Sequence, residues 1–284
     1  MINRVLSFGD ILKSGKYTIH SRFSRAINYL GEGGLISVVG EEAGSGPINI
    51  VIDSPFLVDA STLEITPEWV RLGDEVFILE EQKKYCSELP EIWYDPLKLK
   101  GGILLFREFL SLNAPDESLY FIFSEKRNKG SSSTFTDALK LRMIAGYRKI
   151  INRNYSGGVA LLRGAGYGFT PGGDDFIGGM LGGLYMIERL SFMDLSETRR
   201  IIYNHSLYGN PVSEAFNLCA FMGRFFQKQK NLIIAMVGGD RKAIYENGKN
   251  LLSIGATSGA DFATGLISAF DQFLFHRGEK CYPG

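Results

Sequence analysis

The pattern of hydrophobic and polar positions divides the chain into a strand-rich first part and a helical remainder. Short runs of β-branched residues at 34–40 and 48–53 are separated by turn-forming residues, a pattern typical of strands. The segment 69–81 predicts two further strands, with Gly73 and Asp74 at the reversal between them. Short strands joined by tight turns indicate a small barrel or sandwich.

From about residue 96 the apolar residues recur at helical spacing, first over 101–113. We therefore predict an α+β fold, with a β-rich part over 1–95 and a mainly helical part over 96–284. One continuous domain is the alternative. Residues 128–137, which include a glycine and three serines, are predicted to form a linker.

The stretch 164–183 reads GAGYGFTPGGDDFIGGMLGG and organises the helical part. Its glycines and proline predict a turn, and the apolar run that follows has the length of a buried helix. Asp174 and Asp175 therefore lie where a helix begins. A helix N-terminus has unpaired backbone N–H groups and a positive dipole end, so it suits anions. A plain N-cap, in which one aspartate accepts from these N–H groups, is the alternative.

A second copy of this pattern precedes the last predicted helix. The sequence SIGATSGADFATG aligns with the first stretch without a gap, and the shared pattern is G-x-T-x-G-[GA]-D-x-x-x-G. The helical glycines of the pattern, Gly178 and Gly265, lie on the same face as the aspartates one turn before them. We expect two helices that cross near these glycines and point both N-termini at one shared pocket.

Such a pocket combines backbone N–H groups for an anion with carboxylates for N–H-bearing groups of a ligand. The candidate catalytic residues are Asp174, Asp175 and Asp261. The candidate substrate-binding or phosphate-binding residues are Thr170, Gly172, Gly173, Thr257, Ser258, Gly259 and Arg163. A bridging Mg²⁺ held by the three aspartates is an open alternative, because carboxylates would otherwise repel a bound anion. The pattern matches neither a P-loop nor a dinucleotide-binding fingerprint.

Composition narrows the classes of function. The 31 basic and 31 acidic side chains balance, so no basic excess indicates nucleic acid as a partner. The three cysteines form no CxxC pair, which indicates neither a zinc site nor a disulfide framework. The start of the chain lacks the pattern of a signal peptide, and no apolar run is long enough for a membrane span. We expect a cytoplasmic protein.

The two glycine-rich loops, together with the early segments HSRFSRAINY, LISVVG and GPINIVID, resemble the AllH family. The resemblance runs from about His20 to Gly265. It adds His20 to the candidate binding residues, with a structural hydrogen bond to the neighbouring serine as the alternative. The chain departs from the family pattern at one position of the first loop. The family commonly has serine after Thr-Pro, where this chain has Gly172.

The resemblance implies a subunit of a bacterial oxamate carbamoyltransferase, used in the anaerobic breakdown of allantoin and purines. Such a complex interconverts oxalurate and phosphate with oxamate and carbamoyl phosphate, and two further subunits are expected as partners. Two other functions stay open. One is a Mg²⁺-dependent phosphotransferase built on the Gly-Asp-Asp run, and the other is a non-catalytic metabolite-binding or structural subunit.

Overall fold

The computed structural model describes residues 4–53, 60–91, 94–123, 134–191 and 193–275. The chain divides into two compact units, which are described separately. The first comprises Met1–Pro90 and Arg224–Lys230, and the second comprises Glu91–Gly223 and Asn231–Gly284. That the β-rich part is an independent domain ending near residue 95 stays a prediction.

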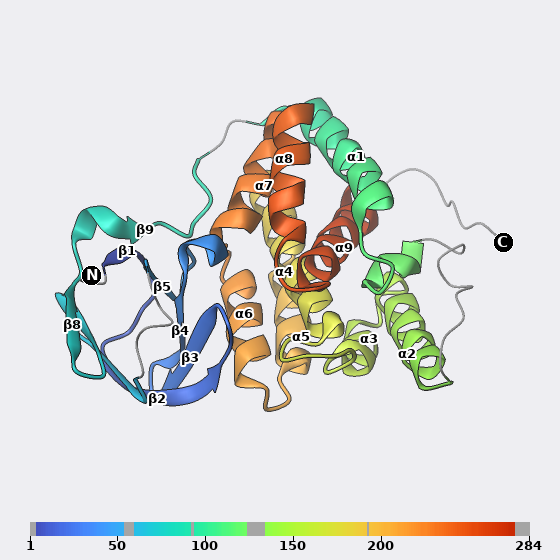
Figure 1. Cartoon of the computed structure of the whole chain (residues 1–284). Coiled ribbons are helices and arrows are strands. Elements are labelled where there is room, and N and C mark those ends of the chain that lie inside the picture. Colours follow the sequence, from blue (N-terminus) through green and yellow to red (C-terminus); the bar gives the residue numbers. More distant parts are fainter. Residues whose placement is uncertain (1–3, 54–59, 92–93, 124–133, 192, 276–284) are drawn as a thin grey trace. The chain divides into compact units, whose positions relative to one another are not determined.

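The first unit is built on one nine-stranded sheet, with strand order β8-β7-β6-β2-β3-β4-β5-β1-β9 (Figure 1). Most neighbouring strands are antiparallel; β4 with β5 and β1 with β9 are parallel. The strands are β1 Val5–Gly9, β2 Gly15–Arg22, β3 Ala26–Gly31, β4 Gly34–Val39, β5 Asn49–Ile52, β6 Thr62–Ile65, β7 Trp69–Leu72, β8 Glu75–Ile78 and β9 Lys84–Tyr85. The 3₁₀ turns Glu41–Ala43 and Glu81–Lys83 precede β5 and β9.

The predicted strands and their reversal are confirmed. Gly73 has a φ of 60°, a left-handed conformation that glycine adopts without strain, and it joins β7 to β8. The fully buried side chains of Ile27, Tyr29 and Ile50 belong to the apolar core of this sheet. Burial of such side chains on one curled sheet gives the β-rich part its own hydrophobic core.

The second unit is helical, as predicted, and the α+β fold class is confirmed. The helices of the described residues are α1 Pro96–Asn113, α2 Thr134–Ile151, α3 Tyr155–Leu162, α4 Gly172–Ser191, α5 Ser196–Ser206, α6 Pro211–Phe221, α7 Gln227–Gly238, α8 Arg241–Leu252 and α9 Ser258–Phe270. A 3₁₀ turn, η4, covers Leu119–Phe123, and a π turn, η6, covers Asp271–Phe275. Residues 128–133 of the predicted linker lie outside the described residues.

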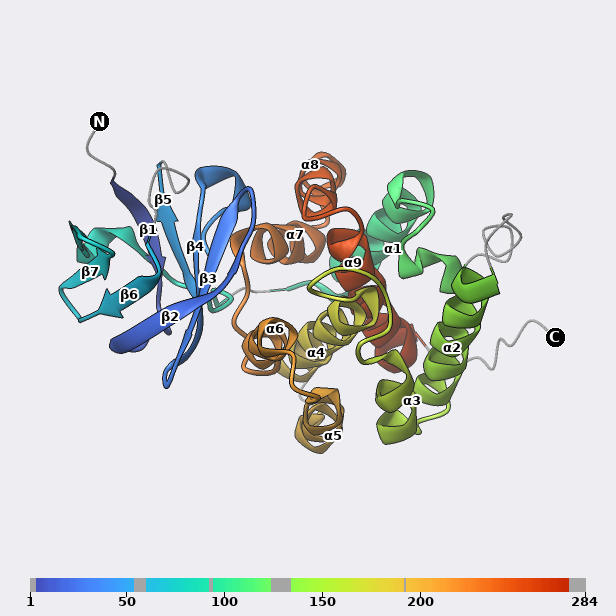
Figure 2. The same ribbon diagram turned by 60° about the horizontal axis from the view of Figure 1, so that its bottom comes forward.

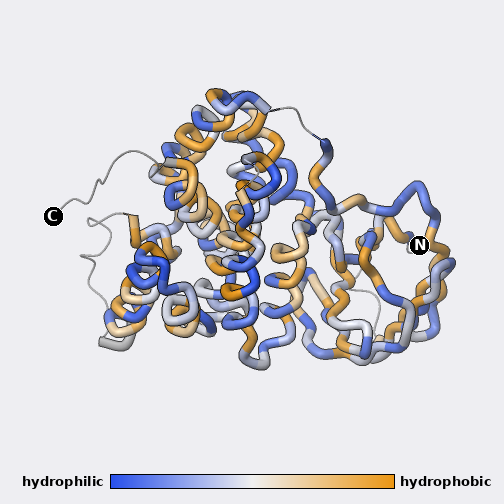
Figure 3. Tube along the Cα trace, turned by 180° about the vertical axis from the view of Figure 1, so that it is seen from behind, coloured by the Kyte–Doolittle hydropathy of each residue, from blue (hydrophilic) through white to orange (hydrophobic). Residues whose placement is uncertain are grey.

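Helix α1 begins five residues before the predicted start at Gly101. The Asp95 side chain accepts from the Leu97 N–H, and Pro96 occupies the first helical position, where its missing N–H costs no hydrogen bond. The prediction missed this Asp-Pro start signal. Hydrophobic and hydrophilic segments alternate along the helices in Figure 3, the pattern of amphipathic helices that bury one face.

Helices α4 and α9 are the central pair of the second unit and lie side by side in Figures 1 and 2. Helix α9 is buried from Gly259 through Phe270, and α4 is buried along most of its length. A helix that is apolar on all sides is typical of a core position, with other helices packed around it. Among the described residues, no helix has the length and apolar character that crossing a membrane requires.

Candidate functional site

The two glycine-rich loops belong to a helix–loop–helix unit that occurs twice. Helix α3 leads through the first loop into α4, and α8 leads through the second loop into α9. Each loop folds back on itself: the Gly173 N–H donates to Ala165 O at 2.8 Å, and the Gly259 N–H donates to Ile254 O at 3.1 Å. Both N–H groups therefore already have an acceptor within their own loop. Phosphate binding by these groups stays a prediction.

Specific glycines of each loop are required by its geometry. A Cβ at Gly173 would lie 1.9 Å from the Leu162 carbonyl oxygen, and one at Gly259 would lie 2.0 Å from that of Leu251. At an equivalent position of the two loops, Gly168 and Gly255 have φ angles of 88° and 59°. L-residues with a side chain rarely adopt these angles, so the repeated glycines preserve a repeated backbone path.

Helices α4 and α9 approach closely through glycines, although not through the expected pair. A Cβ at Gly265 would lie 1.9 Å from the Phe176 carbonyl oxygen, and one at Gly179 would lie 1.9 Å from that of Phe262. Gly178, the expected partner of Gly265, instead faces Asn217 of α6, whose Oδ1 is 2.9 Å from the corresponding Cβ position. The helices therefore cross near the expected glycines, with Gly179 in place of Gly178 at the contact, because helical periodicity does not reveal which neighbouring helix each face contacts.

The two loops meet at the start of the helix pair. The Thr170 Oγ1 and Ser258 Oγ atoms are 3.3 Å apart and join the loops by a hydrogen bond. A Cβ at Gly172 would lie 2.6 Å from Asp261 Oδ2, so the first loop passes directly over the aspartate of the second. The two N-termini therefore do point at one place, as the repeat predicts.

Asp174 is a buried carboxylate that already has two donors. Its Oδ1 accepts from the Gly164 N–H at 2.8 Å, and its Oδ2 accepts from the Tyr208 hydroxyl at 2.6 Å. Burial raises the pKa of Asp174, and these hydrogen bonds oppose the shift. Neither donor belongs to the first turn of α4, so Asp174 does not serve as a plain N-cap. It ties the first loop to the segment between α5 and α6.

Asp261 is 1% exposed, and only one of its two carboxyl oxygens has a hydrogen-bond partner among the described residues. Its Oδ1 accepts from the Leu119 N–H at 2.6 Å, whereas its buried Oδ2 has no hydrogen-bond partner among the described residues. Burial raises the pKa of Asp261 to about 6, against the lowering effect of hydrogen bonds from Leu119 and Thr257.

Asp175 presents a second unsatisfied oxygen beside Asp261. Its Oδ2 is buried and has no hydrogen-bond partner among the described residues. Burial raises the pKa of Asp175 well above the ordinary value, and the nearby charges of Asp261 and Asp174 raise it further. The hydroxyls of Ser258 and Thr170 face the same carboxyl group and oppose the shift. Two carboxyl groups with unsatisfied oxygens thus share the place where the loops meet.

We expect Asp261 to make folding stability fall as the pH rises. The folded state holds the Asp261 proton up to about pH 6, whereas the unfolded chain releases it near pH 3.8. The contribution of this group to the free energy of unfolding is therefore complete below pH 3.8. It decreases between these two values by about 3 kcal/mol and is constant above them.

The Asp261→Asn variant tests this expectation, because asparagine has nearly the same shape and does not ionise. We expect urea unfolding to show that the stability of the variant relative to the wild type increases by about 2.5 kcal/mol from pH 4 to pH 7.5. A difference between the two proteins that is the same at both pH values would contradict the expected burial cost.

Arg163 and His20 each have hydrogen-bond partners other than Asp175 and Asp261. The Arg163 Nη1 donates to the carbonyl oxygens of His205 and Leu207, at 3.0 and 3.1 Å, and so contacts the C-terminal end of α5. His20 lies on β2 in the first unit, with its Nδ1 3.2 Å from Ser21 Oγ. Anion binding by either residue stays a prediction.

The sequence prediction missed two groups at the site. Tyr208 bonds to Asp174, and the backbone N–H of Leu119 bonds to Asp261. Leu119 gave no sequence signal, because any residue supplies a backbone N–H. For Tyr208 a weak signal existed: the run Tyr-Gly-Asn-Pro ends one helix and begins the next, and Asn210 both caps α6 and donates to Phe169 O in the first loop.

The side chains near the paired loops give limited support for a resident metal ion. Among the described residues, no three or more histidine, cysteine, aspartate or glutamate side chains lie close enough to hold one together. Asp175 and Asp261 offer two carboxylates flanked by hydroxyls, so a Mg²⁺ ion there would need further oxygen ligands from water or substrate. The magnesium alternative stays a prediction.

The helix–loop–helix pair is also the part of the chain that compares with known proteins. Residues 162–270 match the family described as oxamate carbamoyltransferase subunit AllH. No curated protein and no solved structure was found to match the chain. The match spans both loops, α4 and α9, and confirms over this range the resemblance inferred from the loop motifs. The region that brings Asp175 and Asp261 together is thus similar to oxamate carbamoyltransferase subunit AllH.

Proposed function

We propose that this chain is a subunit of an oxamate carbamoyltransferase-like complex and that its paired loops bind the carbamoyl group. The reaction interconverts oxalurate and phosphate with oxamate and carbamoyl phosphate. One observation carries the proposal: Asp175 and Asp261 each keep a buried carboxyl oxygen without a hydrogen-bond partner where the two loops meet. Leaving such an atom unsatisfied costs about 1–3 kcal/mol, which a ligand's donor offsets.

A carbamoyl group has the chemistry to satisfy both oxygens. Its planar NH₂ carries two N–H donors that point in different directions, and each carboxyl oxygen accepts one of them. The family match over residues 162–270 supports a carbamoyl-transferring complex as the setting for this site. Thr170 and Ser258, whose hydroxyls already join the loops, would hold the two halves around the group.

The raised pKa values support a role in proton transfer as well as in binding. When phosphate attacks the carbamoyl carbon of oxalurate, the C–N bond to oxamate breaks and the leaving nitrogen must gain a proton. Burial raises the pKa of Asp175, which favours its protonated form, and we assign the supply of this proton to its carboxyl group. In the reverse direction, the same group as a carboxylate takes the proton back. Asp174, whose oxygens are engaged with Gly164 and Tyr208, is a positioning residue in this scheme.

Reconstitution of the complex tests the proposed function. The full chain is combined with its partner subunits, and carbamoyl phosphate is measured from oxalurate and phosphate. We expect no turnover when this chain is omitted and turnover when it is restored. Binding of ATP that requires Mg²⁺, without carbamoyl transfer, would support the phosphotransferase instead. Turnover by the partners alone at the full rate would reduce this chain to a structural role.

A further inference from the structure

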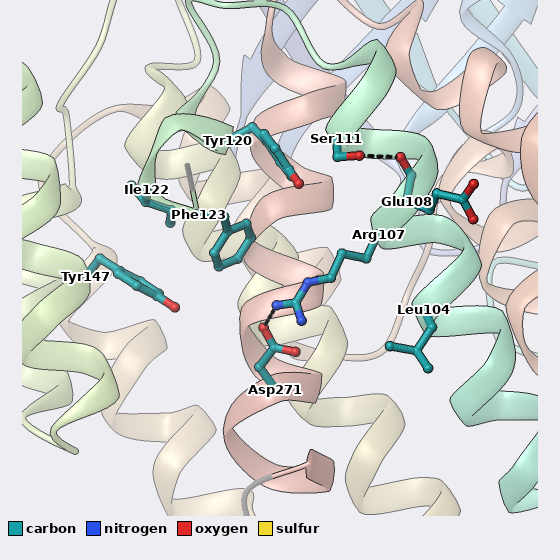
Figure 4. A pocket seen from close by; sticks show the side chains of 9 residues that line it. All are labelled: Leu104, Arg107, Glu108, Ser111, Tyr120, Ile122, Phe123, Tyr147 and Asp271. Carbon is teal, nitrogen blue, oxygen red and sulfur yellow. Dashed lines mark hydrogen bonds and ion pairs between the residues drawn. The ribbon is translucent and has the colours of Figure 1, made fainter. Parts of the chain in front are cut away.

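A cavity of about 800 Å³ lies in the second unit and is separate from the paired loops. Its lining comes from α1, η4, α2 and the residue after α9: Leu104, Arg107, Glu108, Ser111, Tyr120, Ile122, Phe123, Tyr147 and Asp271 (Figure 4). We call it the Arg107 cavity. Asp271 is ten residues beyond Asp261 along α9, or about 15 Å at the rise of an α-helix. The volume is within the usual range for small-molecule sites, about 300–1,000 Å³.

Two charged side chains of the Arg107 cavity form a donor and acceptor pair. Arg107 and Asp271 point toward each other in Figure 4 and form an ion pair. The Asp271 side chain is 15% exposed and that of Arg107 is 39% exposed, so the acid is mostly covered while the guanidinium is still accessible. The guanidinium has further N–H donors beyond the one bonded to Asp271. Because the two charges balance, the pair favours a polar ligand without net charge.

The walls of the Arg107 cavity are aromatic and suit a flat ligand. Phe123 contacts Tyr120 and Tyr147 edge-on, with ring centroids 5.7 and 5.9 Å apart, and the Arg107 guanidinium lies 5.4 Å from the Phe123 centroid. Aromatic rings and a guanidinium plane both stack on planar groups. Burial and the charge of Asp271 raise the pKa of Tyr147 to about 12. Its hydroxyl, which hydrogen-bonds to Ser268, is therefore neutral near pH 7.

We propose that the Arg107 cavity binds a small, neutral, planar ring whose edge carries a carbonyl beside an N–H, as in a lactam. The carbonyl accepts from Arg107, the N–H donates to Asp271, and the ring packs against the aromatic wall. Glu108, which lines the same cavity, is paired with Arg241 at 3.3 Å, so its charge is partly offset. This inference does not depend on the proposed carbamoyl chemistry.

Uracil is a suitable probe, and 1,3-dimethyluracil is its matched control without N–H groups. Calorimetry and saturation-transfer NMR on the full chain should show saturable binding of uracil, and binding of the dimethyl compound at least about tenfold weaker. The Arg107→Met variant keeps the apolar stem and should weaken uracil binding about tenfold or more, the usual effect of losing a charged hydrogen bond. Arg200→Met removes an exposed arginine of α5 that pairs with Glu197 outside the lining, and it should leave the affinity unchanged.

A second variant keeps the test decisive if Arg107→Met fails to fold. Phe123→Leu keeps an apolar side chain but removes the ring on which the ligand is proposed to pack, and it should weaken uracil binding several-fold. The proposal is overturned if uracil shows no saturable binding, if the dimethyl compound binds equally well, or if neither variant changes the affinity. Tighter binding of benzoate than of uracil would also overturn it, since an anion site would then be present instead.

Discussion

Replacing Asp175 with asparagine is expected to lower carbamoyl transfer by the reconstituted complex by about 100-fold or more. Asparagine has the shape of aspartate but carries no transferable carboxyl proton, and its amide presents a donor where the carbamoyl N–H needs an acceptor. We expect a loss of similar size for Asp261→Asn, whose buried Oδ2 also lacks a partner among the described residues. The measurement is the rate of carbamoyl phosphate formation from oxalurate and phosphate.

Two control variants separate this effect from general damage. Asp174→Asn should cost less than tenfold, because an amide oxygen at this position still accepts from the Gly164 N–H that Asp174 binds. Asp194→Asn should have no effect, because Asp194 is exposed just beyond the other end of α4, about 30 Å from the loops. Full activity of both Asp175→Asn and Asp261→Asn in a complex that assembles would leave the paired loops with a structural role only.

Replacing Gly265 with alanine is expected to lower the free energy of unfolding by about 3 kcal/mol. The new Cβ would lie 1.9 Å from the Phe176 carbonyl oxygen, so α4 and α9 must move apart along their buried contact. Backbone atoms on both sides of this contact leave no flexible side chain to adjust. Urea unfolding of the isolated chain measures the loss.

Gly101→Ala is the matched control, because Gly101 also lies within a helix and a Cβ there meets nothing within 4 Å. Alanine has the higher helix propensity, so this variant should be more stable than the wild type by about 0.5–1 kcal/mol. Equal effects of the two substitutions would show that helix propensity, rather than the close approach of α4 and α9, decides the result at Gly265.

Local signals were sufficient for most of the elements. The β-branched runs, the Gly73–Asp74 reversal and the helical spacing after residue 96 each depend on neighbours in sequence, and the structure confirms them. The start of α1 was missed although its signal was present, since Asp95 and Pro96 form a cap that the periodicity of 101–113 does not include. The order of strands in the sheet had no comparable signal, because the β1–β9 and β2–β6 pairs are distant in sequence.

The repeated motif was the strongest sequence signal for the site. Two loops with the same Gly, Thr, Gly, Asp and Gly positions predicted equivalent helix N-termini, and the Thr170–Ser258 hydrogen bond joins them. The motif also predicted a glycine-mediated crossing. It did not predict that Gly179, rather than Gly178, faces α9, because the two positions differ by about 100° around the helix and only the packed neighbours distinguish them.

Short-range spacing was enough to predict the α+β class, the two glycine-rich helix starts and the three carboxylates near them. Which of these carboxylates have hydrogen-bond partners depends on the packing of distant segments. Asp174 receives its second donor from Tyr208 and Asp261 receives its donor from Leu119, residues 34 and 142 positions away. The unpartnered oxygens of Asp175 and Asp261 follow from the same packing. Whether a buried polar atom is satisfied depends on which distant segments fold against it, and no local pattern encodes that.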